Sequence, residues 1–215
     1  MNNLEIAKNI PDALAILPQW VCWGAKGKPR KMPFDPRTGT PAKAGQPETW
    51  ADFQTAAQAV EAGRFEGVGF EFDAAGCVVG IDFDHCLHDG KCDPGVEAWV
   101  KKLDSYTEIS PSGEGLHVFC SAHLPGQAIK RKEAEMYDRG RYFTMTGRPY
   151  GPEKPLRAAQ DTVNALYAEL QARAQKQQER PTEKPTAAPG GVDIEDAPLI
   201  AKMKKGRNGA AFSAL

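Results

Sequence analysis

The clearest alternation of apolar and polar positions along the chain lies at Val78–Asp84. Successive side chains of a β-strand point to opposite faces of a sheet. The apolar residues at positions 79, 81 and 83 therefore share one face, and Asp82 and Asp84 share the other. This pattern predicts a strand whose apolar face is buried in a core and whose opposite face carries two carboxylates.

Other short apolar runs, bounded by glycine, proline and polar residues, predict further strands. They lie at 19–23, 68–72, 107–110, 116–121, 134–138 and 141–146. The turn at Asp73–Gly76 predicts a hairpin between strand 68–72 and the acidic strand. Arg139 and Gly140 predict a second hairpin that joins strands 134–138 and 141–146.

Apolar residues at helical spacing predict four helices, at 4–17, 50–61, 95–103 and 156–178. Thr49 is the expected N-cap of the second helix, because a threonine oxygen can accept the free amide hydrogen bonds of a first turn. The four tryptophans, Trp20, Trp23, Trp50 and Trp99, lie in or beside apolar runs and are expected in the core rather than as base-stacking platforms.

The length of 215 residues and the 41% hydrophobic content suit one globular domain with a tail. Residues 175–193 are rich in Gln, Pro, Thr, Ala and Gly, which is typical of a linker. We expect a domain at 1–172, a flexible linker at 173–193, and at 194–215 the start of a truncated helical domain of a longer protein. No apolar run is long enough to cross a membrane, and the five cysteines without a secretory signal indicate the cytoplasm.

Charge is balanced over the whole chain, with a formal net charge of −1, but basic residues gather locally. Such local patches can hold a phosphate backbone while the protein stays neutral overall. For each of the two runs of basic residues named next, a solvated basic loop is an equally good explanation when the run is taken alone. One run contains Lys26, Lys28, Arg30, Lys31, Arg37 and Lys43, and the other contains Lys130, Arg131, Lys132, Arg139, Arg141 and Arg148.

Three further features bear on the chemistry of the acidic strand. Two carboxylates on one strand face repel each other, and a divalent cation held by hard oxygen ligands relieves that repulsion. The Ser/Gly-rich turn before His117 is suited to a phosphate. A third acid lies near 135–138, where strand parity favours Glu135 over Asp138, and Arg141 can pair with a phosphate or with Asp138.

The order of these pieces resembles the signature of the archaeo-eukaryotic primase (AEP) superfamily, in particular the primase-polymerase domains of phage and plasmid replication proteins. That signature is a strand with two aspartates between hydrophobic residues, then a Ser/His element, then a strand with a third acid. The matching segments are Ile81–Asp84, Ser112–His117 and Glu135–Tyr137. Similarity to phage relatives extends to Tyr106–His117, Gly140–Gly147, Trp20–Trp23 and Lys31–Phe34, and it covers about residues 15–170. The chain departs from the minimal family pattern because four residues separate Ser112 from His117.

The resemblance implies an α+β fold, with an AEP-like core whose antiparallel or mixed sheet is similar to an RNA-recognition motif and is flanked by helices, beside a smaller N-terminal α/β half. It implies a template-directed DNA primase and polymerase that transfers nucleotides from (d)NTPs onto a 3′-hydroxyl. Asp82, Asp84 and Glu135 would be the catalytic ligands of two Mg²⁺ or Mn²⁺ ions, with Asp138 as the alternative third ligand. The expected nucleotide-binding residues are Ser110, Ser112, Gly113, His117, Arg141 and Lys31. Single-stranded DNA template, primer, and a helicase or helical domain are the expected partners.

Two alternative functions fit parts of the pattern. A metal-dependent nuclease also uses carboxylates and two metal ions, but it has no need of groups that bind a triphosphate. A non-catalytic module for single-stranded nucleic acid would gain nothing from acids near phosphates. A zinc site is a third consideration, because His85, Cys86, His88 and Cys92 lie close together, but their spacing is not a recognised finger pattern and we expect a plain loop.

Overall fold

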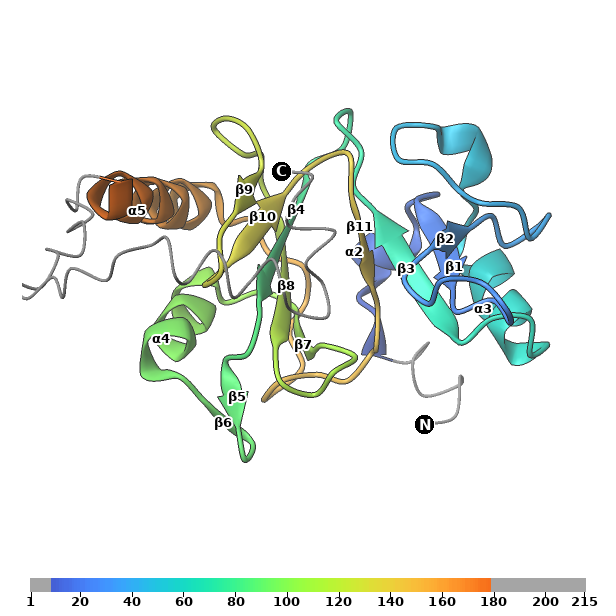
Figure 1. Cartoon of the computed structure of the whole chain (residues 1–215), viewed down its shortest axis with the longest axis horizontal. Helices are drawn as coiled ribbons and strands as arrows, with labels where there is room; N and C mark the ends of the chain where they lie inside the picture. Colours follow the sequence, from blue (N-terminus) through green and yellow to red (C-terminus); the bar gives the residue numbers. More distant parts are fainter. Residues whose placement is uncertain (1–8, 179–215) are drawn as a thin grey trace, which may run out of the picture. The chain divides into compact units, whose positions relative to one another are not determined.

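The strands fall into two antiparallel sheets and one short hairpin in the computed structural model, which describes residues 9–178 (Figure 1). The four-stranded sheet has the order β11 (Tyr142–Thr144), β3 (Gly67–Glu71), β1 (Trp20–Trp23) and β2 (Pro33–Phe34). The five-stranded sheet has the order β7 (Thr107–Ile109), β8 (Leu116–Ser121), β4 (Val78–Phe83), β10 (Glu135–Tyr137) and β9 (Ile129–Lys130). The hairpin pairs β5 (Leu87–His88) with β6 (Lys91–Cys92).

The helices of the described residues are α2 (Asp12–Ala15), α3 (Phe53–Glu61), α4 (Pro94–Leu103) and α5 (Gln160–Gln178), with a 3₁₀ turn at Pro47–Thr49. Residues 9–177 belong to one compact unit. The combination of antiparallel sheets with helices confirms the expected α+β class. Within residues 9–178, none of these helices has the length and apolar content needed to cross a membrane.

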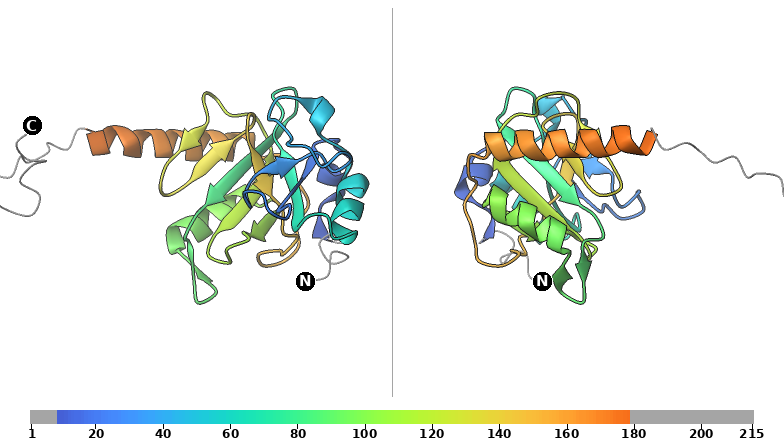
Figure 2. Two further views of the ribbon diagram at one scale, coloured as in Figure 1. Left: turned by 45° about the vertical axis from the view of Figure 1, so that its right-hand side comes forward. Right: turned by 90° about the vertical axis from the view of Figure 1, so that its left-hand side faces the viewer.

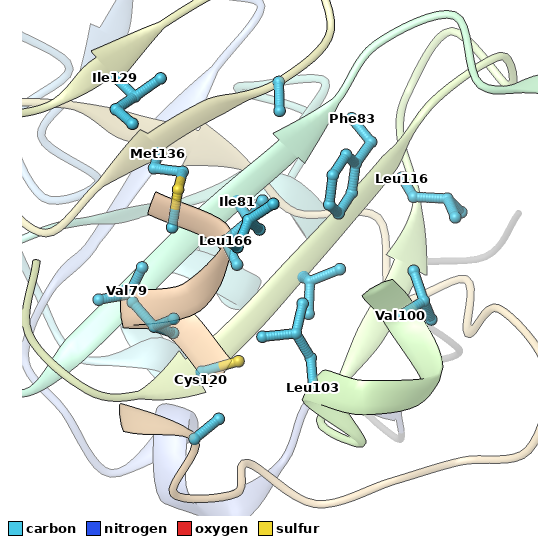
Figure 3. Packing of buried hydrophobic residues seen from close by; sticks show 14 of the residues in the cluster. Val79, Ile81, Phe83, Val100, Leu103, Leu116, Cys120, Ile129, Met136 and Leu166 are labelled. Carbon is cyan, nitrogen blue, oxygen red and sulfur yellow. The ribbon is translucent and has the colours of Figure 1, made fainter. Parts of the chain in front are cut away.

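One face of the five-stranded sheet is covered by α4 and α5 (Figure 2). The apolar positions of β4, which are Val79, Ile81 and Phe83, all point into this core, as the alternation predicts. Figure 3 shows them packed with Leu103 of α4 and Leu166 of α5, among other residues. Each of these buried side chains contributes on the order of 2 kcal/mol by leaving water, so this core fixes which face β4 turns away from the helices.

A second core joins the two sheets and is built mainly from aromatic side chains. Phe72 at the end of β3, Phe119 of β8 and Phe143 of β11 contact one another, with ring centroids 4.9–6.1 Å apart. Tyr106 and Tyr137 extend the cluster from the side of the five-stranded sheet. Because both sheets contribute rings, this core sets the position of β11 against β4, and with it the walls of the site described below.

The predicted hairpin between 68–72 and the acidic strand is wrong. β3 pairs with β1 and β11, whereas β4 pairs with β8 and β10, so the two segments belong to different sheets. The reason lies at Gly80, where a side chain would overlap the ring of Phe72. The two segments therefore pack face to face through that ring instead of edge to edge through backbone hydrogen bonds.

The predicted hairpin between 134–138 and 141–146 is also wrong. β10 pairs with β4 and β9, and β11 pairs with β3. The chain crosses from one sheet to the other at Gly140, whose φ of 66° is a conformation that glycine adopts without steric cost. Tyr137 and Phe143 then meet edge to face in the aromatic core, with ring centroids 5.9 Å apart, which a paired hairpin would not allow.

The remaining elements follow the sequence more closely. The strands expected at 19–23, 107–110 and 116–121 and the helix expected at 95–103 are confirmed within one residue or two. Thr49 is not the helix cap, because α3 begins at Phe53 and Asp52 accepts the amide hydrogen bond of Thr55 at 2.8 Å. Thr49 instead closes the 3₁₀ turn by donating to the carbonyl of Gln46. The last helix begins at Gln160 instead of 156. Of the first predicted helix, residues 4–8 lie outside the described residues, as do the linker beyond 178 and the segment 194–215.

Gly80 yields a stability prediction. Gly80→Ala should lower the free energy of unfolding by about 2 kcal/mol, because the added methyl must displace the packed rings of Phe72 and Phe143. Urea denaturation followed by circular dichroism measures this change. Gly95→Ala is the matched control, since Gly95 faces open space in α4 and alanine favours a helix. Equal stability of the Gly80→Ala variant and the wild type would contradict this account of the aromatic core.

Candidate active site

A cavity of about 340 Å³ opens where residues of the two sheets face each other. Its first wall comes from the end of β4 and from the β7–β8 hairpin. Its second wall comes from β1, β11 and the basic loop before β2. The first wall is lined by Asp82, Asp84, Ser110, Pro111, Ser112 and His117, and the second by Trp23, Arg30, Lys31, Arg141, Tyr142, Phe143 and Thr144.

Asp82 lies at the centre of the acidic part of the site. It is opposite His117 on β8 and opposite Glu135 on β10, because β4 is the central strand of its sheet. Asp84 follows in the turn after Phe83 and is exposed, with its Oδ1 accepting the amide of His85 at 3.1 Å. The sheet register thus brings together two acids and a histidine that are far apart in the sequence.

The charge of Asp82 is unfavourable in this environment. Burial raises the pKa of the Asp82 carboxyl above its ordinary value; the charge of His117 and that of Lys31 lower it, and the neighbouring charges of Asp84 and Glu135 raise it. The net direction is upward, which means that the ionised form lacks sufficient compensation from the protein alone. A cation placed among these carboxylates would remove the repulsion.

His117 is buried between two carboxylates. Its Nδ1 lies 3.3 Å from Oε1 of Glu108, and its Nε2 lies 3.8 Å from Oδ1 of Asp82. Burial alone would lower the pKa of the imidazole, but the hydrogen bond and charge of Glu108 and the charge of Asp82 raise it, and the net pKa is raised. The arrangement favours an imidazole that presents an N–H group toward the cavity.

Glu108 contacts His117 of the site but was not singled out in the sequence analysis. Its side chain is fully buried and accepts hydrogen bonds from Tyr106, His117, Thr146 and Gly147. A signal for it exists in the sequence: a hairpin that turns at Ser112 and Gly113 places position 108 opposite position 117. Arg30, Trp23 and Thr144 were also not singled out as site residues, although they line the cavity.

The serine-rich turn is internally bonded. The hydroxyls of Ser110 and Ser112 are 3.0 Å apart, and Ser112 also accepts the amide of Glu114 at 3.2 Å. The amide of Gly113 donates to the carbonyl of Ser110, and Gly113 is not among the cavity-lining residues. The two serines therefore reach the cavity, whereas the Gly113 amide, which was expected to be free for a phosphate, is already engaged.

Basic groups occupy the second wall. Arg141 is half exposed, lies over the ring of Tyr137, and has an Nη2 4.0 Å from Oε2 of Glu135. Lys31 lines the cavity, and its carbonyl accepts the hydroxyl of Tyr142 at 2.9 Å. Arg30 stacks over Trp23 at 5.5 Å and pairs with Glu66. Positive charge thus faces the acids across the cavity, as a site for an anion with a bound cation requires.

The two candidates for the third acid lie in different surroundings. Glu135 is beside Asp82, and its Oε2 accepts the hydroxyl of Tyr137 at 2.7 Å. Asp138 is buried, and it accepts the amide of Leu124 at 3.0 Å and pairs with Arg139. Burial acts to raise the pKa of the Asp138 carboxyl, but these hydrogen bonds lower it overall. The position beside Asp82 makes Glu135 the better candidate.

The donors fit a hard divalent cation by their chemistry. Carboxylate oxygens are the preferred protein ligands of Mg²⁺ and Mn²⁺. Asp82, Asp84 and Glu135 lie around the end of β4. Burial is the main cause of the raised pKa of Asp82, and the charges of Asp84 and Glu135 add to it. Among residues 9–178, no three His, Cys, Asp or Glu side chains are already arranged as a closed metal site, so the carboxylates would have to turn toward a bound ion.

The residues considered for zinc have other contacts. The His85 ring lies 3.1 Å from Glu114, and the His88 ring lies 3.4 Å from Asp93. Cys86 is buried, and its thiol donates to the carbonyl of Phe83. Burial raises the pKa of Cys86 to about 12. All five cysteines are free thiols.

Three tryptophans, Trp20, Trp23 and Trp50, are buried as expected, and Trp99 is partly buried against the helix-covered core. The indole N–H of Trp23 donates to the carbonyl of Val68 at 3.0 Å, which holds this ring against Gly67 at the edge of the cavity.

Comparison with known proteins gives one informative similarity. No protein-family model matches the chain. In an alignment 167 residues long, which covers 73% of this chain, the chain is 34% identical to a DNA primase-polymerase from Nitratiruptor phage NrS-1. The matched region is 23% of that protein, so the chain spans about a quarter of the length of this relative.

Proposed function

Because this chain belongs to the primase-polymerase family, we propose that it carries out template-directed synthesis of nucleic acid by transferring nucleotides from (d)NTPs onto a 3′-hydroxyl. One observation carries the proposal: a single cavity collects Asp82 and Asp84 with His117, the two serines and Arg141. Acids that can bind divalent ions therefore lie beside groups that can bind a triphosphate, which is the combination that nucleotidyl transfer needs.

Asp82, Asp84 and Glu135 would hold two Mg²⁺ or Mn²⁺ ions. When bound, such ions lower the pKa of an attacking hydroxyl and neutralise charge on the leaving pyrophosphate. The contribution of the protein is to hold Asp82 and Asp84 at the end of β4, with Glu135 beside Asp82 on β10. The pairing of β4 with β8 and β10 gives them a rigid base, as a precise site requires.

The groups around the acids would bind the triphosphate. His117 presents Nε2 beside Asp82, and Ser110 and Ser112 line the same wall. Arg141 and Lys31 supply positive charge from the opposite wall. Charge-assisted hydrogen bonds from such donors both orient a triphosphate and stabilise charge that develops during transfer.

The fold supports a more specific assignment to the AEP superfamily. In that assignment the five-stranded sheet with α4 and α5 is the core similar to an RNA-recognition motif. The four-stranded sheet with α3 is the smaller half, completed by β11 from the C-terminal part of the chain. The site residues come from both halves, as expected if substrate binds between them.

The remaining partners follow from the proposed reaction. Single-stranded DNA template and primer would approach the basic wall that carries Arg30 and Lys31. Since the relative is much longer, a helicase or a helical domain in a longer parent protein is a further proposed partner. We propose the bacterial cytoplasm as the location of the reaction.

A three-outcome assay tests the proposal. The protein is incubated with a primed single-stranded template, labelled dNTPs or NTPs, and Mg²⁺ or Mn²⁺. Template-dependent chain growth supports a primase-polymerase, and shortening of the DNA supports the metal-dependent nuclease instead. Binding without chemistry, unchanged by Asp82→Ala, supports the non-catalytic module and contradicts the proposal.

A further inference from the structure

We infer that Glu108 is the positioning residue of the site: it fixes the ring of His117 for triphosphate binding and holds the two walls of the cavity together. This inference rests on the proposed function and deepens it by assigning a role to a residue behind the site. Glu108 itself does not line the cavity. It would act on the substrate only through its neighbours.

The contacts of Glu108 account for both oxygens of its carboxylate. Oε1 lies 3.3 Å from Nδ1 of His117 and accepts the amide of Thr146 at 3.0 Å. Oε2 accepts the hydroxyl of Tyr106 at 2.8 Å and the amide of Gly147 at 2.9 Å. A fully buried carboxylate is costly unless donors surround it, and here four groups from three segments of the chain do so.

The hydrogen bond to His117 fixes the ring. An imidazole that donates from Nδ1 to a carboxylate has one orientation, with Nε2 at the opposite end. In this structure that end lies on the side of Asp82. The ring also packs on Phe143, with centroids 5.0 Å apart, so Glu108 supplies a polar restraint at Nδ1 and Phe143 an apolar one.

The bonds to Thr146 and Gly147 connect the walls. Glu108 belongs to β7 of the five-stranded sheet, whereas these two amides lie two and three residues after the end of β11 of the four-stranded sheet. The Thr146 hydroxyl adds a bond of 2.7 Å to the carbonyl of Ile109. Loss of the carboxylate would therefore loosen His117 on one wall and, on the other, β11, which contains Thr144 and directly follows Arg141.

Glu108→Gln is the informative variant because it keeps the size of the side chain. Whichever oxygen becomes an amide nitrogen will face at least one backbone N–H, since Thr146 contacts both oxygens. Triphosphate affinity should fall about 10-fold, the effect of disturbing one hydrogen bond to a charged group. Glu97→Gln is the matched control: Glu97 also accepts a tyrosine hydroxyl, at 2.7 Å from Tyr150, but lies outside the cavity.

A double-mutant cycle with His117→Ala separates positioning from general loss of structure. The probe is dATP with Mg²⁺, measured by equilibrium dialysis on the full chain. Most of the effect of Glu108 on binding should pass through His117, and its bonds to Thr146 and Gly147 should account for a smaller remainder. Glu108→Gln should therefore weaken binding about 10-fold in the wild-type background and less than 2-fold when His117 is already absent. Losses that simply multiply in the double variant would overturn the inference.

A measurement on the wild type keeps the inference testable if the variant does not fold. Long-range ¹H–¹⁵N NMR of the His117 ring should show Nδ1 as a protonated, hydrogen-bonded donor. A ring whose Nδ1 is unprotonated would overturn the role of Glu108. Failure of the wild type to extend a primer, while dATP binding shows the non-multiplicative pattern, would instead overturn the proposed function and leave the role of Glu108 in place.

Discussion

Asp82→Asn should lower the rate of template-directed synthesis by about 1,000-fold, the scale of removing one essential electrostatic group from a phosphoryl-transfer site. Asp82 is the central acid, flanked by His117 and Glu135 on the neighbouring strands. Its replacement by asparagine would remove a proposed metal ligand while keeping the size of the side chain. The fold should be retained or slightly stabilised, because burial and the charges of Asp84 and Glu135 disfavour the ionised carboxylate.

Two measurements check this expectation: primer extension under saturating dNTP, and Mn²⁺ binding followed by electron paramagnetic resonance. The variant should lose both synthesis and tight Mn²⁺ binding, and Asp84→Asn should behave similarly. Asp89→Asn is the control, since Asp89 is exposed, lies outside the cavity, and has a positive φ that asparagine tolerates. Full synthesis by a folded Asp82→Asn variant would exclude this residue as a ligand.

Glu71→Gln should raise the free energy of unfolding at pH 8 by roughly 3 kcal/mol and leave it nearly unchanged at pH 4.5. Glu71 is buried, and its Oε2 has no hydrogen-bond partner among the described residues. Burial raises the pKa of this carboxyl to about 7, although the charge of Arg141 acts to lower it.

The sign of the effect follows from proton binding. Between about pH 4.5 and 7 the unfolded chain has released the Glu71 proton and the folded protein still holds it, so the fold loses stability as pH rises. Above pH 7 the loss is complete and constant. Glutamine has no proton to release and removes this pH dependence. Urea denaturation at the two pH values measures it, with the exposed Glu153→Gln as control. A Glu71→Gln variant that is no more stable than wild type at pH 8 would contradict the raised pKa.

Local patterns in the sequence predicted several of the elements that surround the cavity. Alternation along 78–84 identified the strand, its buried face and the acidic face, because a side-chain period of two is a property of any strand. The helix at 95–103 and the strand at 116–121 were likewise predictable from short-range apolar spacing. The basic loop with Lys31 and the Ser110–His117 turn were found from residue type alone.

The two predicted hairpins failed for one physical reason. A turn such as Asp73–Gly76 is compatible with a hairpin and with a crossover, and the choice depends on residues distant in sequence. Here Phe72 and Phe143 fill the space above Gly80, which places β3 and β11 in a sheet of their own. Strand pairing is therefore decided by the aromatic core and not by the turns.

The sequence by itself determined the chemistry available to this protein: paired acids on a buried strand, a histidine after a serine-rich turn, and basic residues on two separate segments. Tertiary structure alone decided which of these groups meet. It put His117 and Glu135 on either side of Asp82, left Asp138 bonded to Leu124 and Arg139, and supplied Glu108 as the buried partner of the histidine. Local spacing fixes the direction of a side chain within its own element, but contacts between elements depend on how whole faces pack.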